Sequence, residues 1–413
     1  MLAADGTPLK RSLARALRRQ KLRAFMLVAP LLIFVLLAFV APIADMLFRS
    51  VENTELAGNL PRTTLALRDW DPNSGQVPDE PVFKALHADL VEAVEAKNHM
   101  AIGRRLSFEA PGYSSLFRKT GRRVARMDID APFAAQFADV DKDWSDIETW
   151  KLIQHFSGPY TAGYFLRAVD LTSTGDGVEW RPENQRIFGF LFTRTLIMSV
   201  AITISCLLLA YPIAWLLANL PARNANLLLI LVLLPFWTSL LVRTSAWKVL
   251  LQQQGVINDL LVWIGAVGDD GRLALINNQT GTIIAMTHIL LPFMVLPLYS
   301  VMKTIPPSYL RAAKSLGATN WTAFWRVYFP QSVPGIGAGA VLVFILAIGY
   351  YITPELVGGT SGVFISNQIA YYMNSSNFNW GFAAALGSIL LGAVLILYWT
   401  YDRIVGIDNV KLG

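Results

Sequence analysis

Cysteine is nearly absent from this 413-residue sequence: the one cysteine, Cys206, lies inside a long apolar segment. A single thiol excludes an intrachain disulfide and argues against a cysteine-based metal cluster. Charged residues are also scarce, at 15%, whereas soluble proteins carry roughly a quarter. With 54% of its residues hydrophobic, the chain has more apolar surface than a soluble domain of this length can bury. The composition therefore indicates a membrane protein.

Signatures of nucleotide binding and of catalysis are missing as well. The sequence has no GxxxxGK[ST] motif, so we expect it to bind no ATP by a phosphate-binding loop, and any coupling to ATP has to involve another chain. The stretch GIGAGA (Gly335–Ala340) begins an apolar run and follows no strand, which favours close helix packing over dinucleotide binding. We expect no metal, no cofactor and no catalytic residue in this chain.

Six apolar runs are each long enough to cross a bilayer, which takes about 20 helical residues. They predict an all-α polytopic membrane protein, and they are Phe25–Ala44, Leu196–Leu220, Asn226–Val242, Gly281–Met302, Gly335–Pro354 and Phe382–Tyr401. The first run has an apolar core of about 20 residues, longer than that of a cleaved signal peptide, so we expect it to be an uncleaved anchor.

Basic residues are distributed asymmetrically about these runs. If the basic N-terminal tail is cytoplasmic, most of the other loop cations fall on the same side, as the positive-inside rule requires; they are Arg223, Lys303, Arg311, Lys314, Arg326, Arg403 and Lys411. We therefore expect both termini in the cytoplasm and the tail on anionic membrane lipid, with no nucleic acid as partner. The expected organisation is a basic tail (1–24), a first transmembrane helix (25–47), an external polar insertion (48–187), a membrane core (188–404) with a cytoplasmic loop (303–334), and a second tail (405–413).

The external insertion has no run of membrane length, and its acidic residues outnumber its basic ones. Within it, Phe83, Leu86, Leu90 and Val94 recur at helical spacing and predict an amphipathic helix. Two interpretations remain open for the insertion: a lid on the outer helix ends, or a docking platform for a soluble partner.

The cytoplasmic loop reads as a helix–turn–helix elbow. Pro306 and Pro307 suit a helix start, and Gly317 suits a left-handed stop. Thr319 or Asn320 can cap a second, aromatic helix, which we expect to end at Pro330 and Pro334. The residues alone leave open whether this elbow docks a partner or only stabilises its own helices.

The elbow resembles the EAA loop of ABC-importer permeases, with R-A-A-K-S-L-G at Arg311–Gly317, F-P at Phe329–Pro330 and P-G-I at Pro334–Ile336. The resemblance implies coupling helices that contact a separate ATPase subunit, which uses ATP and Mg²⁺. It departs from the family at Arg311, where the family has Glu, so we expect an acidic residue on the ATPase. The implied coupling residues are Arg311, Ala312, Ala313, Lys314, Leu316, Gly317, Ala318, Phe324, Tyr328 and Pro330.

Several membrane stretches are similar to spermidine/putrescine-type permeases: LLAYPIAWLLANLP (Leu208–Pro221), LPFWTSLLVRTSAWKVLL (Leu234–Leu251), GVINDLLVWIG (Gly255–Gly265) and ITPELVGG (Ile352–Gly359). This implies six transmembrane helices of the type I ABC importer permease fold in a bacterial inner membrane. It also implies a second permease subunit, an ATPase pair and an external solute-binding protein. The implied solute is a polyamine, an opine or an amino-acid-like molecule.

Six residues are candidates for the translocation pathway: Trp237, Arg243, His288, Tyr350, Tyr351 and Glu355. Each has a plainer interpretation, such as helix packing for Trp237 or structural anchoring for Arg243. Tyr350 stands where polyamine permeases carry an acidic residue, which weakens the polyamine interpretation. An ion-coupled transporter or channel, or a membrane-embedded enzyme, is the alternative function, but the spans lack paired acids.

Overall fold

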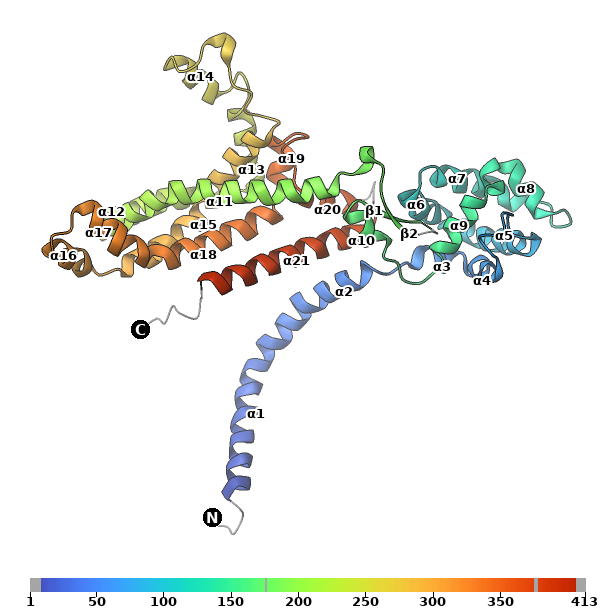
Figure 1. Ribbon diagram of the computed structural model, residues 1–413, viewed down its shortest axis with the longest axis horizontal. Coiled ribbons are helices and arrows are strands. Elements are labelled where there is room, and N and C mark those ends of the chain that lie inside the picture. The colour runs from blue at the N-terminus through green and yellow to red at the C-terminus, as the bar shows by residue number, and fades with distance from the viewer. Residues whose placement is uncertain (1–8, 175–176, 375–377, 406–413) are drawn as a thin grey trace. The chain divides into compact units, whose positions relative to one another are not determined.

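The computed structural model describes residues 9–174, 177–374 and 378–405 (Figure 1). Most of the C-terminal tail and the first eight residues of the basic tail therefore lie outside the described residues. The chain forms two compact units, residues Met1–Ala162 and Gly163–Gly413.

The first unit begins with one long apolar helix. It consists of α1 (Leu9–Val35), a π-helical turn (Leu36–Val40) and α2 (Ala41–Arg49), and the segment Gln20–Arg49 is long and apolar enough to span a membrane. None of the side chains in its most apolar stretch is buried. Pro42 lies at the start of α2, just after the π-helical turn. Because a π-helical turn is wider than an α-helical one, the proline ring does not clash with the carbonyl of the preceding turn.

The rest of the first unit is a small helical domain, which we call the outer domain (residues 54–162). Its elements are α3 (Thr54–Asn59), α4 (Pro61–Ala66), α5 (Glu80–Glu95), α6 (His99–Glu109), α7 (Tyr113–Arg123), α8 (Phe133–Val140) and α9 (Ile147–His155), with 3₁₀ turns at Leu67–Asp69, Val124–Arg126 and Lys142–Ser145. The amphipathic helix expected from residue spacing is confirmed as α5, with Phe83, Leu86 and Leu90 buried and Val94 packed against the same core.

Aromatic rings fill the centre of the outer domain. The ring centroids of Trp144 and Trp150 lie 5.6 Å apart, and that of Phe83 lies 4.7 Å from that of Trp150. Both indole N–H groups are satisfied: Trp144 donates to the Thr120 hydroxyl at 2.9 Å, and Trp150 donates to the Trp144 carbonyl at 2.9 Å. Because buried aromatic area dominates core energetics, these rings account for a stable core that turn-rich sequence alone did not predict.

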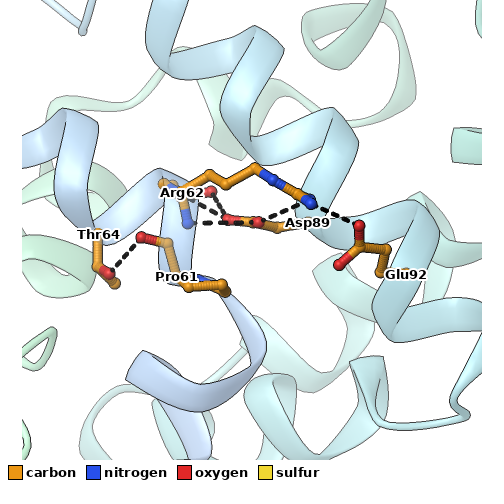
Figure 2. A network of polar contacts seen from close by, with 6 residues as sticks. Pro61, Arg62, Thr64, Asp89 and Glu92 are labelled. Carbon is orange, nitrogen blue, oxygen red and sulfur yellow. Dashed lines mark hydrogen bonds and ion pairs between the residues drawn. The ribbon is translucent and has the colours of Figure 1, made fainter.

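A buried carboxylate ties two helices of this domain together. Asp89 on α5 accepts hydrogen bonds from the backbone N–H and the hydroxyl of Thr63, both at 2.7 Å. Its other oxygen faces Arg62, which also pairs with the exposed Glu92 at 2.6 Å (Figure 2). The acceptor sits at the first turn of α4, where backbone N–H groups have no partner within the helix.

The second unit starts with a segment that we expected to belong to the external insertion. Residues 163–187 form α10 (Gly163–Ala168), the hairpin β1 (Leu171–Thr174) with β2 (Gly177–Trp180), and a 3₁₀ turn (Glu183–Gln185). The carboxylate of Asp170 accepts the N–H groups of Ile187, Phe188 and Gly189 at 2.7–3.1 Å and so caps the long apolar helix that begins at Phe188. The second compact unit therefore begins at Gly163, ahead of the long apolar helix that starts at Phe188.

Three helices form the centre of the second unit: α11 (Phe188–Asn219), α15 (Gln279–Thr304) and α18 (Phe329–Gly349), and all three pack against one another. Their shared core is apolar and includes Met198, Ile289, Met294 and Val343. The last helix, α21 (Trp380–Val405), packs against α18 and α20 (Ile365–Met373). All four long helices meet the length and apolarity of a membrane span.

The expected span Asn226–Val242 is not one continuous helix. The structure instead has α12 (Ala222–Leu233), a 3₁₀ turn (Leu234–Trp237) and α13 (Leu240–Leu250), with a bend of 95° between the two helices. Pro235 lies in the break, and the Ser239 hydroxyl caps the new helix by accepting the Val242 N–H at 3.2 Å. With this broken pair counted as one span, the described residues contain six candidate spans.

Candidate functional site

The elbow occupies one end of the second unit, between α15 and α18 (Figure 1). It consists of α16 (Pro307–Ser315), α17 (Asn320–Ala323) and a π-helical turn (Phe324–Tyr328). As expected, α16 starts at the proline pair, Gly317 has a positive φ of 89°, and Thr319 caps α17 by accepting the Thr322 N–H at 3.2 Å.

The turn between the two arms is a Schellman motif. The Ala318 N–H donates to the Ala313 carbonyl at 3.1 Å, and the Gly317 N–H donates to the Lys314 carbonyl at 3.0 Å. These two bonds satisfy carbonyls that the end of α16 would otherwise leave open, and they require a left-handed residue at position 317. The angle between the arms is thus fixed by the backbone.

The outer surface of the elbow is exposed, basic and apolar. Arg311, Ala312 and Lys314 are exposed, and so are Gly317 and Pro330. The side chains of Leu316 and Trp321 are 89% and 71% exposed. Ala313 and Ala318 are half-buried. Large exposed apolar groups beside cations are typical of a surface that binds another protein.

Phe324 and Tyr328 lie on the opposite face and do not belong to this outer surface. Tyr328 is buried, and Phe324 packs edge-on against Tyr211 of α11, with ring centroids 6.1 Å apart. The Tyr211 hydroxyl in turn shares a hydrogen bond of 3.0 Å with the Ser332 hydroxyl. Phe324 and Tyr328 therefore attach the elbow to the membrane helices. Trp321 and Trp325 are the exposed aromatic residues, and they are not among the coupling residues expected from the sequence.

The aromatic helix does not end at Pro330 and Pro334, contrary to the expectation. The segment Asn320–Gly349 is continuous, because the π-helical turn just before Pro330 removes the clash that its ring would make in an α-helix. The Phe329 N–H reaches back five residues to the Phe324 carbonyl. The elbow is therefore rigidly continuous with α18.

A second feature lies at the end of the unit remote from the elbow, where α19 (Ile352–Val357) and α20 follow α18 (Figure 1). A cavity of about 530 Å³ opens there and includes two pathway candidates, Tyr351 and Glu355. Its other polar lining residues are Thr360, Asn367, Gln368, Tyr371 and Asn374.

Asn367 holds this cavity together. Its side-chain amide nitrogen donates to the Glu355 carboxylate at 2.7 Å and to the Tyr351 carbonyl at 2.9 Å, and its oxygen accepts the Phe364 N–H at 2.9 Å. The buried side chain of Asn367 thus positions the Glu355 carboxylate relative to α19 and α20. No sequence signal beyond a polar residue in the first turn of a helix marks Asn367.

The glycine-rich loop that forms one wall of the cavity (residues 358–363) is held in place by side chains of two neighbouring helices. Arg194 of α11, 9% exposed, donates to the carbonyls of Thr360 and Ser361 at 3.1 and 2.5 Å. The Thr282 hydroxyl of α15 donates to the Gly362 carbonyl at 3.2 Å. In the sequence, the signal for this contact is a lone arginine within an apolar helix, because such charges are rare there and have specific partners.

The remaining pathway candidates lie apart from this cavity. Trp237 is 83% exposed, and the Arg243 guanidinium donates to the Thr238 carbonyl at 3.0 Å, as a structural anchor does. His288 Nδ1 accepts the Trp247 indole N–H at 3.1 Å, so the ring is neutral with its proton on Nε2. The Tyr350 carbonyl accepts the Ser366 hydroxyl at 2.5 Å. Among the described residues, no cluster of His, Cys, Asp and Glu has metal-site geometry.

Comparisons with known proteins agree with this architecture. Residues 192–405 match the family described as binding-protein-dependent transport system inner membrane component. The spermidine/putrescine transport system permease protein PotB of Salmonella typhimurium is 37% identical over 209 residues, which are 50% of this chain and 72% of the relative. The inner membrane ABC transporter permease protein YdcU of Escherichia coli is 34% identical over 267 residues, 61% of this chain and 82% of the relative.

Among solved structures, a bacterial alginate ABC transporter in complex with its alginate pentasaccharide-bound periplasmic protein is similar, with a TM-score of 0.43 and 19% identity over 55% of this chain and 80% of that chain. The family match covers more than half of the sequence and includes the elbow and the cavity. The chain therefore belongs to the inner membrane components of binding-protein-dependent transport systems, and it is a multi-pass permease subunit of an ABC importer, not an enzyme.

Proposed function

We propose that this permease is one of two paired subunits that import a small cationic solute of the polyamine class. Its partners are the second permease subunit, a pair of ATPase subunits that use ATP and Mg²⁺, and an external solute-binding protein. Both termini face the cytoplasm, which places the elbow on the side of the ATPase and the cavity on the side of the binding protein.

The observation that carries this proposal is the exposed elbow on a chain of the permease family. Its outer surface holds two cations, Arg311 and Lys314, beside the exposed side chain of Leu316. An ATPase with an acidic, partly apolar cleft is the complementary partner. Because the elbow continues into α18 without a break, a displacement imposed by the ATPase is transmitted to the core helices.

The solute class is supported by two independent features. PotB relatives carry names of spermidine and putrescine transport. In addition, Glu355 is the one charged side chain among the residues that line the cavity, and it stands with Tyr351 and Tyr371. A carboxylate and aromatic faces attract ammonium groups, the latter by about 0.5–2 kcal/mol.

The test is ATP hydrolysis by the assembled importer in lipid. We expect the chain to co-purify with an ATPase and a second permease. ATP hydrolysis should rise when the binding protein is added with putrescine or spermidine, and not when it is added with a neutral sugar. A chain that purifies without an ATPase would contradict the importer, whereas stimulation by neutral solutes alone would contradict the cationic solute.

A further inference from the structure

The cavity between α19 and α20 has the composition of a binding site, although no role is assigned to it. Its volume of about 530 Å³ is within the range of small-molecule sites. Its lining combines one acid, two tyrosines and three side-chain amides, with no basic residue among them. An anion would find no counter-charge in such a lining, whereas an ammonium group would find both a carboxylate and acceptor oxygens.

The carboxylate of Glu355 is held in place but not neutralised. One oxygen accepts the Asn367 amide, and that amide is fixed by its own bonds to two backbone groups. Within the described residues, Glu355 forms no ion pair, and its other oxygen, Oε1, accepts no hydrogen bond. A fixed acid with an open oxygen is ready to accept a charge-assisted hydrogen bond from a ligand.

The wall of the cavity is also pre-formed. Gly358 and Gly362 approach so closely that a Cβ built at either position would lie 2.6 Å from the Thr282 hydroxyl oxygen. Arg194 and Thr282 secure the same loop from the two neighbouring helices, which removes much of the ordering cost that a flexible loop would add to binding. The Arg194 guanidinium is directed at the loop carbonyls and is not among the groups that line the cavity.

From these contacts we infer that the cavity is the solute-recognition site of this subunit. It binds one protonated amino group, with Glu355 as the counter-charge, Asn367 as its positioning residue, and the rings of Tyr351 and Tyr371 beside the alkyl chain. This inference deepens the proposed function and rests on it for the class of solute. It assigns this subunit, and not the second permease alone, a direct contact with the solute.

The test measures occupancy of the cavity in the assembled importer. Ala370→Cys introduces a thiol into the lining at a position with no role in the proposed binding, while the native Cys206 is buried and gives little background. We expect saturating putrescine to slow the reaction of this thiol with N-ethylmaleimide, read from the mass of this chain, at least about threefold, and 1,4-butanediol to leave it unchanged. Adding Glu355→Gln should remove the protection, because it replaces the charge with an amide of the same size.

Two controls make the result specific. Trp263→Cys places a thiol on an exposed position of α14 (Val256–Trp263), outside the cavity, and putrescine should not protect it. Glu183→Gln makes the same chemical change as Glu355→Gln at an exposed site outside the lining and should leave the protection at residue 370 intact. Protection that survives Glu355→Gln would overturn the assignment of the counter-charge.

The outcomes separate this inference from the proposed function. Protection measures binding and does not depend on transport. Uptake of putrescine by the importer without protection at residue 370 would overturn the cavity assignment alone. Protection without uptake would support the cavity and overturn the polyamine as the transported solute.

Discussion

At the scale of single residues, the functional surfaces depend on positions whose chemistry is hard to replace. Gly317 provides the left-handed backbone of the elbow, Asp89 caps a helix in the outer domain, and Asn367 fixes the acid of the cavity. Gly317 acts through its backbone conformation, Asp89 through the Thr63 N–H, and Asn367 through the Phe364 N–H and the Tyr351 carbonyl. Substitutions at these positions therefore have effects that neighbouring exposed residues do not share.

Gly317→Ala should loosen the elbow. The glycine has a φ of 89°, and an L-residue there costs about 1–2 kcal/mol, although open space surrounds the position. We expect weaker coupling, seen as less solute-stimulated ATP hydrolysis in the assembled importer. Gly268→Ala is the matched control, because Gly268 also has open space but an ordinary φ of −72°. Equal activity in the two variants would contradict the role of the turn.

Asp89→Ala should destabilise the outer domain by about 3 kcal/mol. It removes a buried acceptor and leaves the Thr63 N–H and hydroxyl without their partner. Glu92→Ala breaks only the exposed pair with Arg62 and should cost less than about 1 kcal/mol. Limited proteolysis of the full-length chain, followed through fragments cut between residues 54 and 162, measures both. Equal protease resistance of the two variants would show that the cap contributes nothing.

At the scale of elements, close helix packing sets the geometry of the membrane core. Gly335 lets α18 approach α15: a Cβ built there would lie 3.0 Å from the Cβ of Val301 and 3.2 Å from the Leu298 Cα. The π-helical turn then carries this helix past Pro330 into the elbow. The continuous helix Asn320–Gly349 is tightly packed at Gly335 and exposed in the elbow, so it is suited to transmit a displacement of the elbow to the core helices.

Gly335→Val should separate α15 from α18 and destabilise the core by about 1–3 kcal/mol, because the added methyl groups meet backbone atoms that cannot move away. Gly392→Val is the control on α21, since no atom lies within 4 Å of a Cβ built there. Thermal unfolding of the detergent-purified chain distinguishes the two. Equal melting temperatures would contradict the close contact of the helices.

The sequence predicted those elements whose signals are local. Apolar length identified the long spans, and the proline pair with Gly317 and Thr319 identified the elbow. It failed at the break near Pro235, because the apolar run continues through the bend. It also failed for the outer domain, whose core joins aromatic residues far apart in the chain, and for Asn367, whose partners are set by tertiary structure alone.

At the scale of the whole molecule, the chain has two separate hydrophobic cores, one in the outer domain and one in the second unit. The family match begins at residue 192, after the outer domain, and the relatives cited above match 50–61% of this chain. The two ends of the outer domain meet: the Asn53 N–H donates to the Pro159 carbonyl at 2.9 Å, and the Thr161 N–H donates to the Val51 carbonyl at 2.8 Å. A domain whose ends adjoin can be inserted into a loop with little disturbance to the host.

Replacing residues 54–158 with a short Gly/Ser linker should therefore leave the membrane core intact. We expect the shortened chain to insert, to bind the ATPase and to keep its basal ATP hydrolysis, because the outer domain has a hydrophobic core of its own. Binding of the solute-loaded binding protein to this variant then separates a docking platform from a lid. Aggregation of the variant or loss of the ATPase would show that the core depends on the outer domain.

Site-directed cross-linking can capture the proposed contact between the exposed elbow and a separate ATPase. Leu316→Cys, at an 89% exposed position, carries a photo-activated cross-linker in the assembled importer. Trp399→Cys, 66% exposed on the last apolar helix, is the control. We expect a cross-linked product between residue 316 and the ATPase that is absent for residue 399. Products at residue 316 with lipid or with this chain alone would contradict it.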